Sequence, residues 1–216
     1  MRPYNRHVHL TASAMSVLLG LAAMLNHGIF EIRQGFTATD GLFIEAISME
    51  DRFWSYGTEG AFTLVPNFLI TGIIIVAISL ALIIFAFKYL SVPKGAGILL
   101  AFFIGLTLFG GGLGHLIVSL PTWAFATRIH APLDWYGKKM PERVRLILSK
   151  LWAVFLIAAC FSWLAVMYLG VFGYIPGLRD PDTILHIVFL FLLATTALIS
   201  LAFMCAMAKD VQDRKE

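Results

Sequence analysis

Five long apolar runs constrain the fold of this chain more than any other feature. A helix needs roughly 20 consecutive apolar residues to cross the hydrocarbon core of a bilayer. Each run reaches that length, and charged residues or prolines border the runs. They cover residues 10–30, 62–87, 95–120, 151–175 and 184–208. The sequence therefore predicts a single transmembrane domain over residues 1–216, with the fold class of an all-α membrane protein.

The composition agrees with a chain that folds in lipid. Hydrophobic residues make up 59% of the sequence and charged residues only 13%, whereas soluble domains carry roughly one-quarter charged residues. The net charge of +3 comes from bases at the ends of the runs and in one loop. That pattern is typical of membrane anchoring and gives no support for nucleic acid as a partner. We expect the lipid bilayer as the main partner, and leave open a membrane partner subunit or a homo-oligomer.

The third run, residues 95–120, allows two topologies because it contains a cluster of glycines. Gly110, Gly111, Gly112 and Gly114 weaken a helix by about 1 kcal/mol each relative to alanine in water. As one helix, the run completes a bundle of five transmembrane helices, which we expect for an apolar stretch of this length. As a segment that breaks at the glycines and returns, it leaves four helices plus a re-entrant segment. Gly110 and Gly114 also fit a small-xxx-small step for close helix packing.

Two connections carry opposite charge. The acidic loop, residues 31–61, holds six acids against two arginines, and the basic loop, residues 121–150, holds six bases against two acids. After Pro141 the basic loop has apolar residues at the spacing of one helix face, with bases beside them. This pattern predicts an interfacial helix on the anionic lipids of the inner leaflet.

The distribution of bases predicts the orientation, because Lys and Arg near the ends of spans concentrate on the cytoplasmic side. With five crossings, eleven bases lie on the side of the basic loop and five on the other. With a re-entrant third run, the division is thirteen against three. Both topologies place loop 121–150 and the C-terminus in the cytoplasm, whereas the side of the N-terminus depends on the third run.

Polar side chains inside or beside the apolar runs are costly in lipid and therefore point to function. If all five runs cross, the first and third travel in the same direction and carry a histidine each toward the same membrane face. We expect a polar pocket at that face. Its candidate residues are Asn26, His27, Glu31, Glu59, Asn67, Thr71 and His115.

Three functional interpretations compete for this pocket. In the first, it is a cavity for a small solute or ion that the protein transports or senses. In the second, His27 and His115 are axial ligands of a b-type haem in an electron-transfer subunit. In the third, His27 and Glu31, with His115 or Glu59, bind a metal ion. The non-functional alternative is that these side chains bond to headgroups, water and loop backbone at the interface.

No sequence motif points to catalysis. The chain lacks a phosphate-binding glycine loop before Lys-Ser/Thr and a zinc-protease HExxH motif, and no nucleophile triad can be assigned. We therefore expect no catalytic residues, no resident cofactor and a non-enzymatic protein that transports or senses a small solute or ion. Besides the haem-b subunit, an accessory or scaffold subunit of a membrane complex is the alternative.

Several short patterns resemble those of uncharacterised bacterial multi-pass membrane proteins. They are His27-Gly28-x-Phe30-Glu31, Gln34-Gly35, Gly41-Leu42, Pro66-Asn67-Phe68-Leu69-x-Thr71-Gly72, Gly110-Gly111-Gly112-x-Gly114 and Ala126-Thr127-Arg128-Ile129. The resemblance covers most of the chain. It implies a location in the bacterial cytoplasmic membrane, and no activity, cofactor or ligand follows from it.

Overall fold

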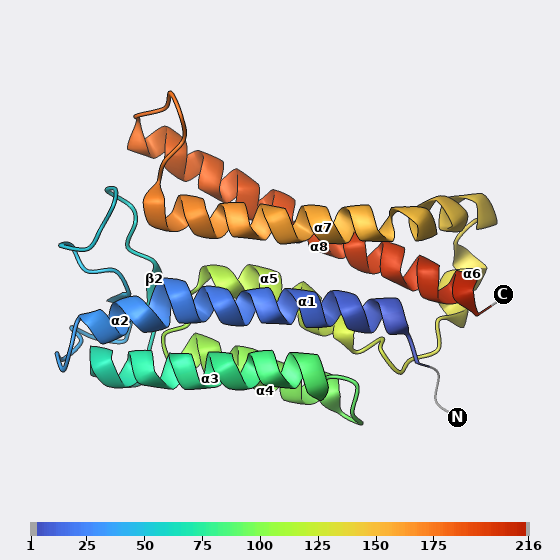
Figure 1. The fold of residues 1–216 in the computed structure, drawn as a ribbon, viewed down its shortest axis with the longest axis horizontal. Helices are drawn as coiled ribbons and strands as arrows, with labels where there is room; N and C mark the ends of the chain where they lie inside the picture. The colour runs from blue at the N-terminus through green and yellow to red at the C-terminus, as the bar shows by residue number, and fades with distance from the viewer. Residues whose placement is uncertain (1–3, 215–216) are drawn as a thin grey trace.

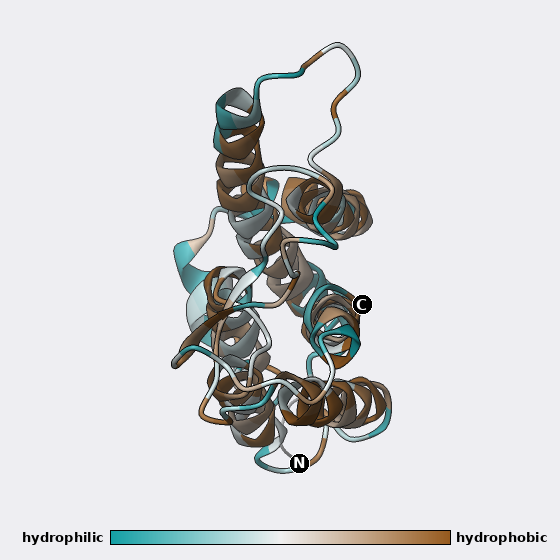
Figure 2. Cartoon of the chain, turned by 90° about the vertical axis from the view of Figure 1, so that its left-hand side faces the viewer, coloured by the Kyte–Doolittle hydropathy of each residue, from teal (hydrophilic) through white to brown (hydrophobic). Residues whose placement is uncertain are grey.

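The computed structural model describes residues 4–214, most of which are helical (Figure 1). Within this part of the chain, four helices are long and apolar enough to cross a membrane, which confirms the prediction of a mostly helical chain with several apolar helices. They cover Arg6–Arg33, Phe68–Lys88, Glu142–Phe172 and Pro181–Asp213. Figure 2 shows hydrophobic residues along the helices and hydrophilic residues in the loops and at helix ends.

The first of these helices is not regular along its whole length. It consists of α1 (Arg6–Ala22), a π-helical turn η1 (Ala23–Gly28) and α2 (Ile29–Arg33). A π turn inserts an extra residue into a helix and is frequent at functional sites. Here the widened turn contains Asn26 and His27.

Helix α3 (Phe68–Lys88) packs antiparallel to this first helix at very short range. At one end of the pair, the Ser13 hydroxyl donates a hydrogen bond of 2.8 Å to the carbonyl oxygen of Ala86. At the other, a Cβ atom on Gly72 would lie 2.6 Å from the carbonyl oxygen of Gly28. The glycine at position 72 therefore allows the two backbones to touch.

The third apolar run is not a single helix, and the favoured prediction of a continuous span over residues 95–120 is wrong. The run forms α4 (Gly95–Leu108) and α5 (Gly114–Ala126), separated by a turn at the glycines. Gly110 and Gly112 have φ angles of +104° and +93°, in the left-handed region that favours glycine. Helix α5 also continues through Pro121 to Ala126, so the predicted basic loop begins later than expected.

Hydrogen bonds at the two ends show that α4 and α5 form a hairpin. At the turn, the Leu113 N–H donates to Gly60 O at 3.2 Å. At the opposite end, the Asn5 N–H donates to Ile129 O at 2.8 Å, and the His130 ring lies 2.6 Å from Ser91 O. The start of α1, the end of α3 and the end of α5 therefore lie together at one end of the molecule. The glycine turn lies at the other end.

Helices α7 (Glu142–Phe172) and α8 (Pro181–Asp213) form a long crossing pair (Figure 1). The Trp152 indole N–H donates to the Thr11 hydroxyl at 2.9 Å and thereby connects α7 to α1. The predicted interfacial helix after Pro141 is not a separate element but the first turns of α7. Arg145 in these turns is only 4% exposed, so its side chain is buried in the protein and does not face a membrane surface. It donates to Gly137 O at 2.9 Å at the end of the short helix α6 (Asp134–Lys139).

The acidic loop is folded, and it adds a small sheet to a chain predicted to be all-α. Strands β1 (Phe43–Glu45) and β2 (Gly60–Phe62) pair antiparallel, with Phe43 opposite Phe62. An ion pair of 2.6 Å between Arg33 and Asp51 holds the loop to the end of α2. The Trp54 indole N–H donates to Gly170 O at 2.9 Å, which holds the loop against α7.

Candidate functional site

Three buried residues of the predicted pocket gather where the glycine turn meets the end of the first helix. His27 and Glu31 are fully buried, and His115 is 8% exposed. His27 lies in the π turn, Glu31 in α2, and His115 at the start of α5. The end of the first helix and the distant start of α5 thus bring two imidazoles and a carboxyl group to one end of the molecule.

The two imidazoles lie edge to face across the glycine turn. The ring centroids of His27 and His115 are 5.5 Å apart, with an interplanar angle of 72°. A Cβ atom on Gly112 would lie 2.3 Å from Nε2 of His27 and 2.8 Å from Nδ1 of His115. Only glycine fits between these two rings.

Gly110 has the same relation to the buried carboxyl group. A Cβ atom at this position would lie 2.8 Å from Oε1 of Glu31 and 2.5 Å from Cγ2 of Thr71. The turn therefore reverses the chain and at the same time leaves room for the polar groups of the first helix. Gly111 has a different constraint, because a Cβ there would lie 2.7 Å from Leu106 O. At Gly114 nothing lies within 4 Å, so this position shows no close helix packing.

The buried polar atoms of this cluster lack hydrogen-bond partners among the described residues. They are Nδ1 and Nε2 of His27, both carboxyl oxygens of Glu31, and Nε2 of His115. A buried polar group without a partner costs roughly 1–3 kcal/mol. A cluster of such groups is therefore expensive, and a ligand or proton that binds there would recover part of the cost.

Glu59 is the acidic residue closest to the histidine pair. Its Oε2 lies 3.6 Å from Nε2 of His27, and its side chain is 22% exposed. Its φ angle is +46°, a strained value for a residue other than glycine. A Cβ on Gly170 of α7 would lie 2.5 Å from Oε1 of Glu59, so the glycine in α7 makes room for the carboxylate.

A cavity of about 330 Å³ opens beside this cluster, between the acidic loop, α5, α7 and α8. Its polar lining includes Asn26, Glu59 and His115. Its aromatic lining consists of Trp54, Tyr56, Trp163 and Phe189. The Trp163 ring lies 5.4 Å from the His115 ring at 79°, so the inner wall of the cavity joins the histidine pair directly. Volumes of this size are typical of small-molecule sites.

The remaining two candidates serve the local structure instead. The Asn67 side chain accepts a hydrogen bond of 3.2 Å from Ile70 N and so caps the start of α3. The Thr71 hydroxyl donates to Val65 O at 3.1 Å and lies 3.1 Å from the Thr63 hydroxyl. Both residues shape the loop before α3 and do not line the cavity.

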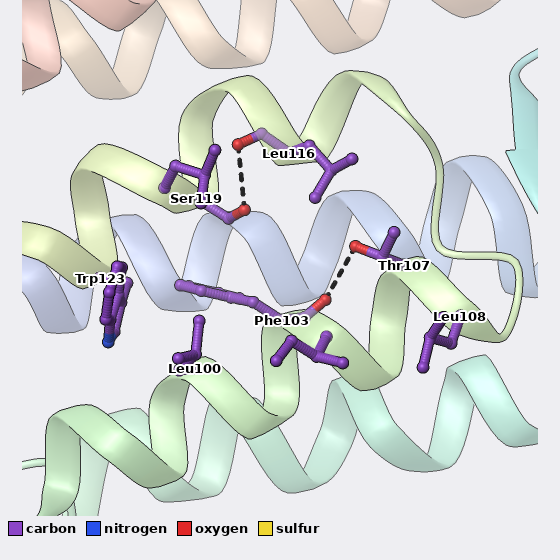
Figure 3. A pocket seen from close by; sticks show the side chains of 9 residues that line it. Leu100, Phe103, Thr107, Leu108, Leu116, Ser119 and Trp123 are labelled. Atoms are coloured by element: carbon purple, nitrogen blue, oxygen red, sulfur yellow. Dashed lines mark hydrogen bonds between the residues drawn. The ribbon is translucent and has the colours of Figure 1, made fainter.

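A second cavity, of about 120 Å³, lies between α4 and α5 (Figure 3). Its lining is almost entirely apolar. The Thr107 hydroxyl donates to Phe103 O at 2.9 Å, and the Ser119 hydroxyl donates to Leu116 O at 3.2 Å. Because both hydroxyls bond within their own helices, this cavity offers little to a polar solute.

The described residues contain no group of three His, Cys, Asp or Glu side chains arranged to hold a metal ion. A haem between the two imidazoles also fits poorly. The Gly112 main chain lies against both rings, and a porphyrin would have to displace it.

The sequence did not identify two further residues that build the site. One is Trp54, whose indole N–H donates to Gly170 O of α7, a long-range contact that no sequence pattern predicts. The other is Gly170, whose one signal in the sequence is its pairing with Gly173 near the end of an apolar run. A Cβ on Gly173 would lie 2.2 Å from the Trp54 ring, so both glycines leave room for side chains of the acidic loop.

No known protein family, curated protein or solved structure matches this chain, so its function is inferred from the site alone.

Proposed function

We propose that this protein is a non-enzymatic, multi-pass membrane protein that binds a small solute or ion at its polar cavity and transports or senses it. One observation carries the proposal: buried imidazole and carboxyl groups without hydrogen-bond partners among the described residues converge at the turn of a broken apolar segment, beside an open cavity. Transporters build sites in this way, because an interrupted helix exposes polar groups at membrane depth only where a cavity receives them.

The proposal includes a topology of four crossings plus a hairpin. Helices α4 and α5 have 14 and 13 residues, or roughly 20 Å each at 1.5 Å per residue. The hydrocarbon core is about 30 Å thick. Each arm is therefore too short to be a comfortable span, and the pair enters and leaves on one side.

This topology gives the cleaner separation of charge. Thirteen of the sixteen Lys and Arg residues fall on the side of the basic loop and both termini, two of them (Arg2 and Lys215) outside the described residues. Arg33, Arg52 and Arg179 fall on the other side. The rule that bases concentrate inside then places the basic loop and both termini in the cytoplasm, against anionic inner-leaflet lipids. The cavity lies toward the outer face.

No observation favours the alternatives in the same way. A haem ligated by both imidazoles would need the space between them, which the Gly112 main chain occupies. An accessory or scaffold subunit has no use for unpartnered polar groups in its interior, since packing alone is served by apolar side chains.

Complementation of a strain deleted for the gene tests the proposal. The strain carries the wild type, His27→Ala or His115→Ala, and its growth is compared across solutes, ion concentrations and pH. We expect both variants to reach the membrane in wild-type amounts and to lose complementation. His186→Ala is the matched control, because this exposed histidine bonds to Asp182 O in its own helix. If both site variants keep every phenotype that the wild type restores, the proposal is wrong.

A further inference from the structure

We infer that the cavity beside Glu59 binds a small organic cation, of the quaternary or tertiary ammonium class. This inference rests on the proposed function and names the ligand class of the same site. It combines three features of the cavity: the sign of its charge, the character of its walls and the way in which Glu59 is held.

The charge of the lining selects a cation. The residues that line the cavity include the carboxylate of Glu59 and no lysine or arginine. The one basic group paired with Glu59 among the described residues is His27, with 3.6 Å between Nε2 and Oε2. An anionic solute would meet the carboxylate without a compensating positive charge, so the cavity disfavours anions.

The walls select an organic cation over a metal ion. Trp54, Tyr56, Trp163 and Phe189 contribute four aromatic rings, and Trp54 meets Tyr56 edge to face with centroids 5.7 Å apart. Aromatic rings attract the methyl groups of an ammonium ion through their electron-rich faces. A hard metal cation instead needs about six oxygen ligands, which a wall of this composition does not supply. The cavity volume of about 330 Å³ is ample for an ammonium ion with a short apolar body.

Several contacts hold Glu59 in place. The residue adopts a strained φ of +46°, and Gly170 lacks the Cβ that would collide with its carboxylate. Trp54 holds the same loop by donating to Gly170 O, and the Tyr56 hydroxyl donates to Asp182 at 2.5 Å. The loop is therefore attached to both α7 and α8 on either side of the cavity. Strain that is retained by such contacts is typical of a binding site.

Binding of choline to the purified full-length protein tests this inference. The protein is kept in a maltoside detergent without phosphocholine lipids, and binding is followed by titration calorimetry and tryptophan fluorescence. The uncharged analogue 3,3-dimethylbutan-1-ol has the same shape with carbon in place of nitrogen. We expect choline to bind at least tenfold more tightly than this alcohol. Glu59→Gln should weaken choline binding at least tenfold, whereas Glu50→Gln, an exposed acid of the same loop, should leave it unchanged.

Three results would overturn the inference: no choline binding by wild-type protein with a cooperative thermal transition, equal binding of the alcohol, or full binding by a folded Glu59→Gln variant. Complementation separates these results from a failure of the proposed function. If His27→Ala and His115→Ala lose complementation while choline fails to bind, the ligand class is wrong and the proposed function stands.

Discussion

The carboxylate of Asp210, near the end of α8, accepts a hydrogen bond of 3.0 Å from the backbone N–H of Val8 in the first turn of α1. It also accepts one of 2.9 Å from the His7 N–H. The first N–H groups of a helix have no partner within it, and here a residue about 200 positions away supplies one. This contact closes the end of the molecule that holds both termini of the described chain, by joining its first and last helices.

Asp210→Ala should destabilise the protein by about 1–2 kcal/mol, the usual cost of losing a helix cap. Thermal unfolding in detergent measures the change. Asp213→Ala is the comparison, because this exposed residue forms an i,i+4 pair of 2.9 Å with Lys209 and lies 3.6 Å from Nδ1 of His7, but caps no helix N–H in the described part of the chain. An exposed i,i+4 pair is worth about 0.3–0.5 kcal/mol. Equal losses for the two variants would show that Asp210 is not acting as a cap.

Hydrophobic length alone was enough to predict the four long helices, since each run is far longer than a buried helix of a soluble protein requires. The third run was different. Its glycines permit packing, a break or a plain span, and tertiary contacts decide among them. Leu64 N donates to Leu108 O at 2.9 Å, and Leu113 N donates to Gly60 O, so the loop after β2 fixes the turn. Such pairings cannot be derived from the run itself.

The grouping of His27 with His115 was predicted from a partly incorrect topology. Runs one and three were expected to be parallel spans, and α4 does run parallel to α1 up to the glycine turn. His115 then follows the reversal, so it reaches the same level from the returning arm. The π turn that contains His27 has no visible signal in the sequence Ala23–Gly28, because those residues are equally compatible with an α-helix.

Gly112→Ala should disrupt the site more than any other alanine substitution in the turn. The new Cβ would lie 2.3 Å from Nε2 of His27, and the φ of +93° is strained for alanine. We expect a loss of at least about 2 kcal/mol in stability, together with loss of complementation. Gly97→Ala in α4 is the matched control, because nothing lies within 4 Å of the new Cβ and this residue does not line the cavity. A Gly112→Ala protein with wild-type melting and complementation would contradict the described turn.

Gly170→Ala should separate ligand binding from folding. The added methyl group would lie 2.5 Å from Oε1 of Glu59 and would push the carboxylate away from its place. We expect choline binding to fall at least tenfold, while α7 stays intact because alanine favours helix. Circular dichroism and calorimetry check both parts. Gly105→Ala is the control, since its Cβ would make an ordinary contact of 3.6 Å with Ile78.

The Asp180 carboxylate at the start of α8 should stabilise the fold at neutral pH, and this stabilisation should disappear in acid. The Thr183 hydroxyl and then the Thr183 N–H donate to the Asp180 carboxylate, and these bonds lower the pKa of Asp180 below its ordinary value of 3.8. A group whose pKa is lowered by folding stabilises the protein above its unfolded pKa, and that contribution is lost as the pH falls through the lowered value. Asp180→Ala should therefore lower the Tm at pH 7, and the difference from wild type should shrink below pH 3.8. Asp40→Ala, an exposed loop residue, should show no such convergence.

Cysteine labelling should distinguish four crossings plus a hairpin from five crossings. Single cysteines at Met49, Lys94 and Lys138 are placed in a chain whose native Cys160 and Cys205 are replaced by alanine. The hairpin puts Lys94 and Lys138 on the same side, because α4 and α5 return to the end where His130 meets Ser91. In the proposed orientation this side is cytoplasmic. A membrane-impermeant maleimide should label position 49 in intact cells, and positions 94 and 138 only after permeabilisation. Labelling of position 94 but not 138 in intact cells is the pattern of a continuous third span. That result would contradict the hairpin, and therefore also the glycine turn on which the site depends.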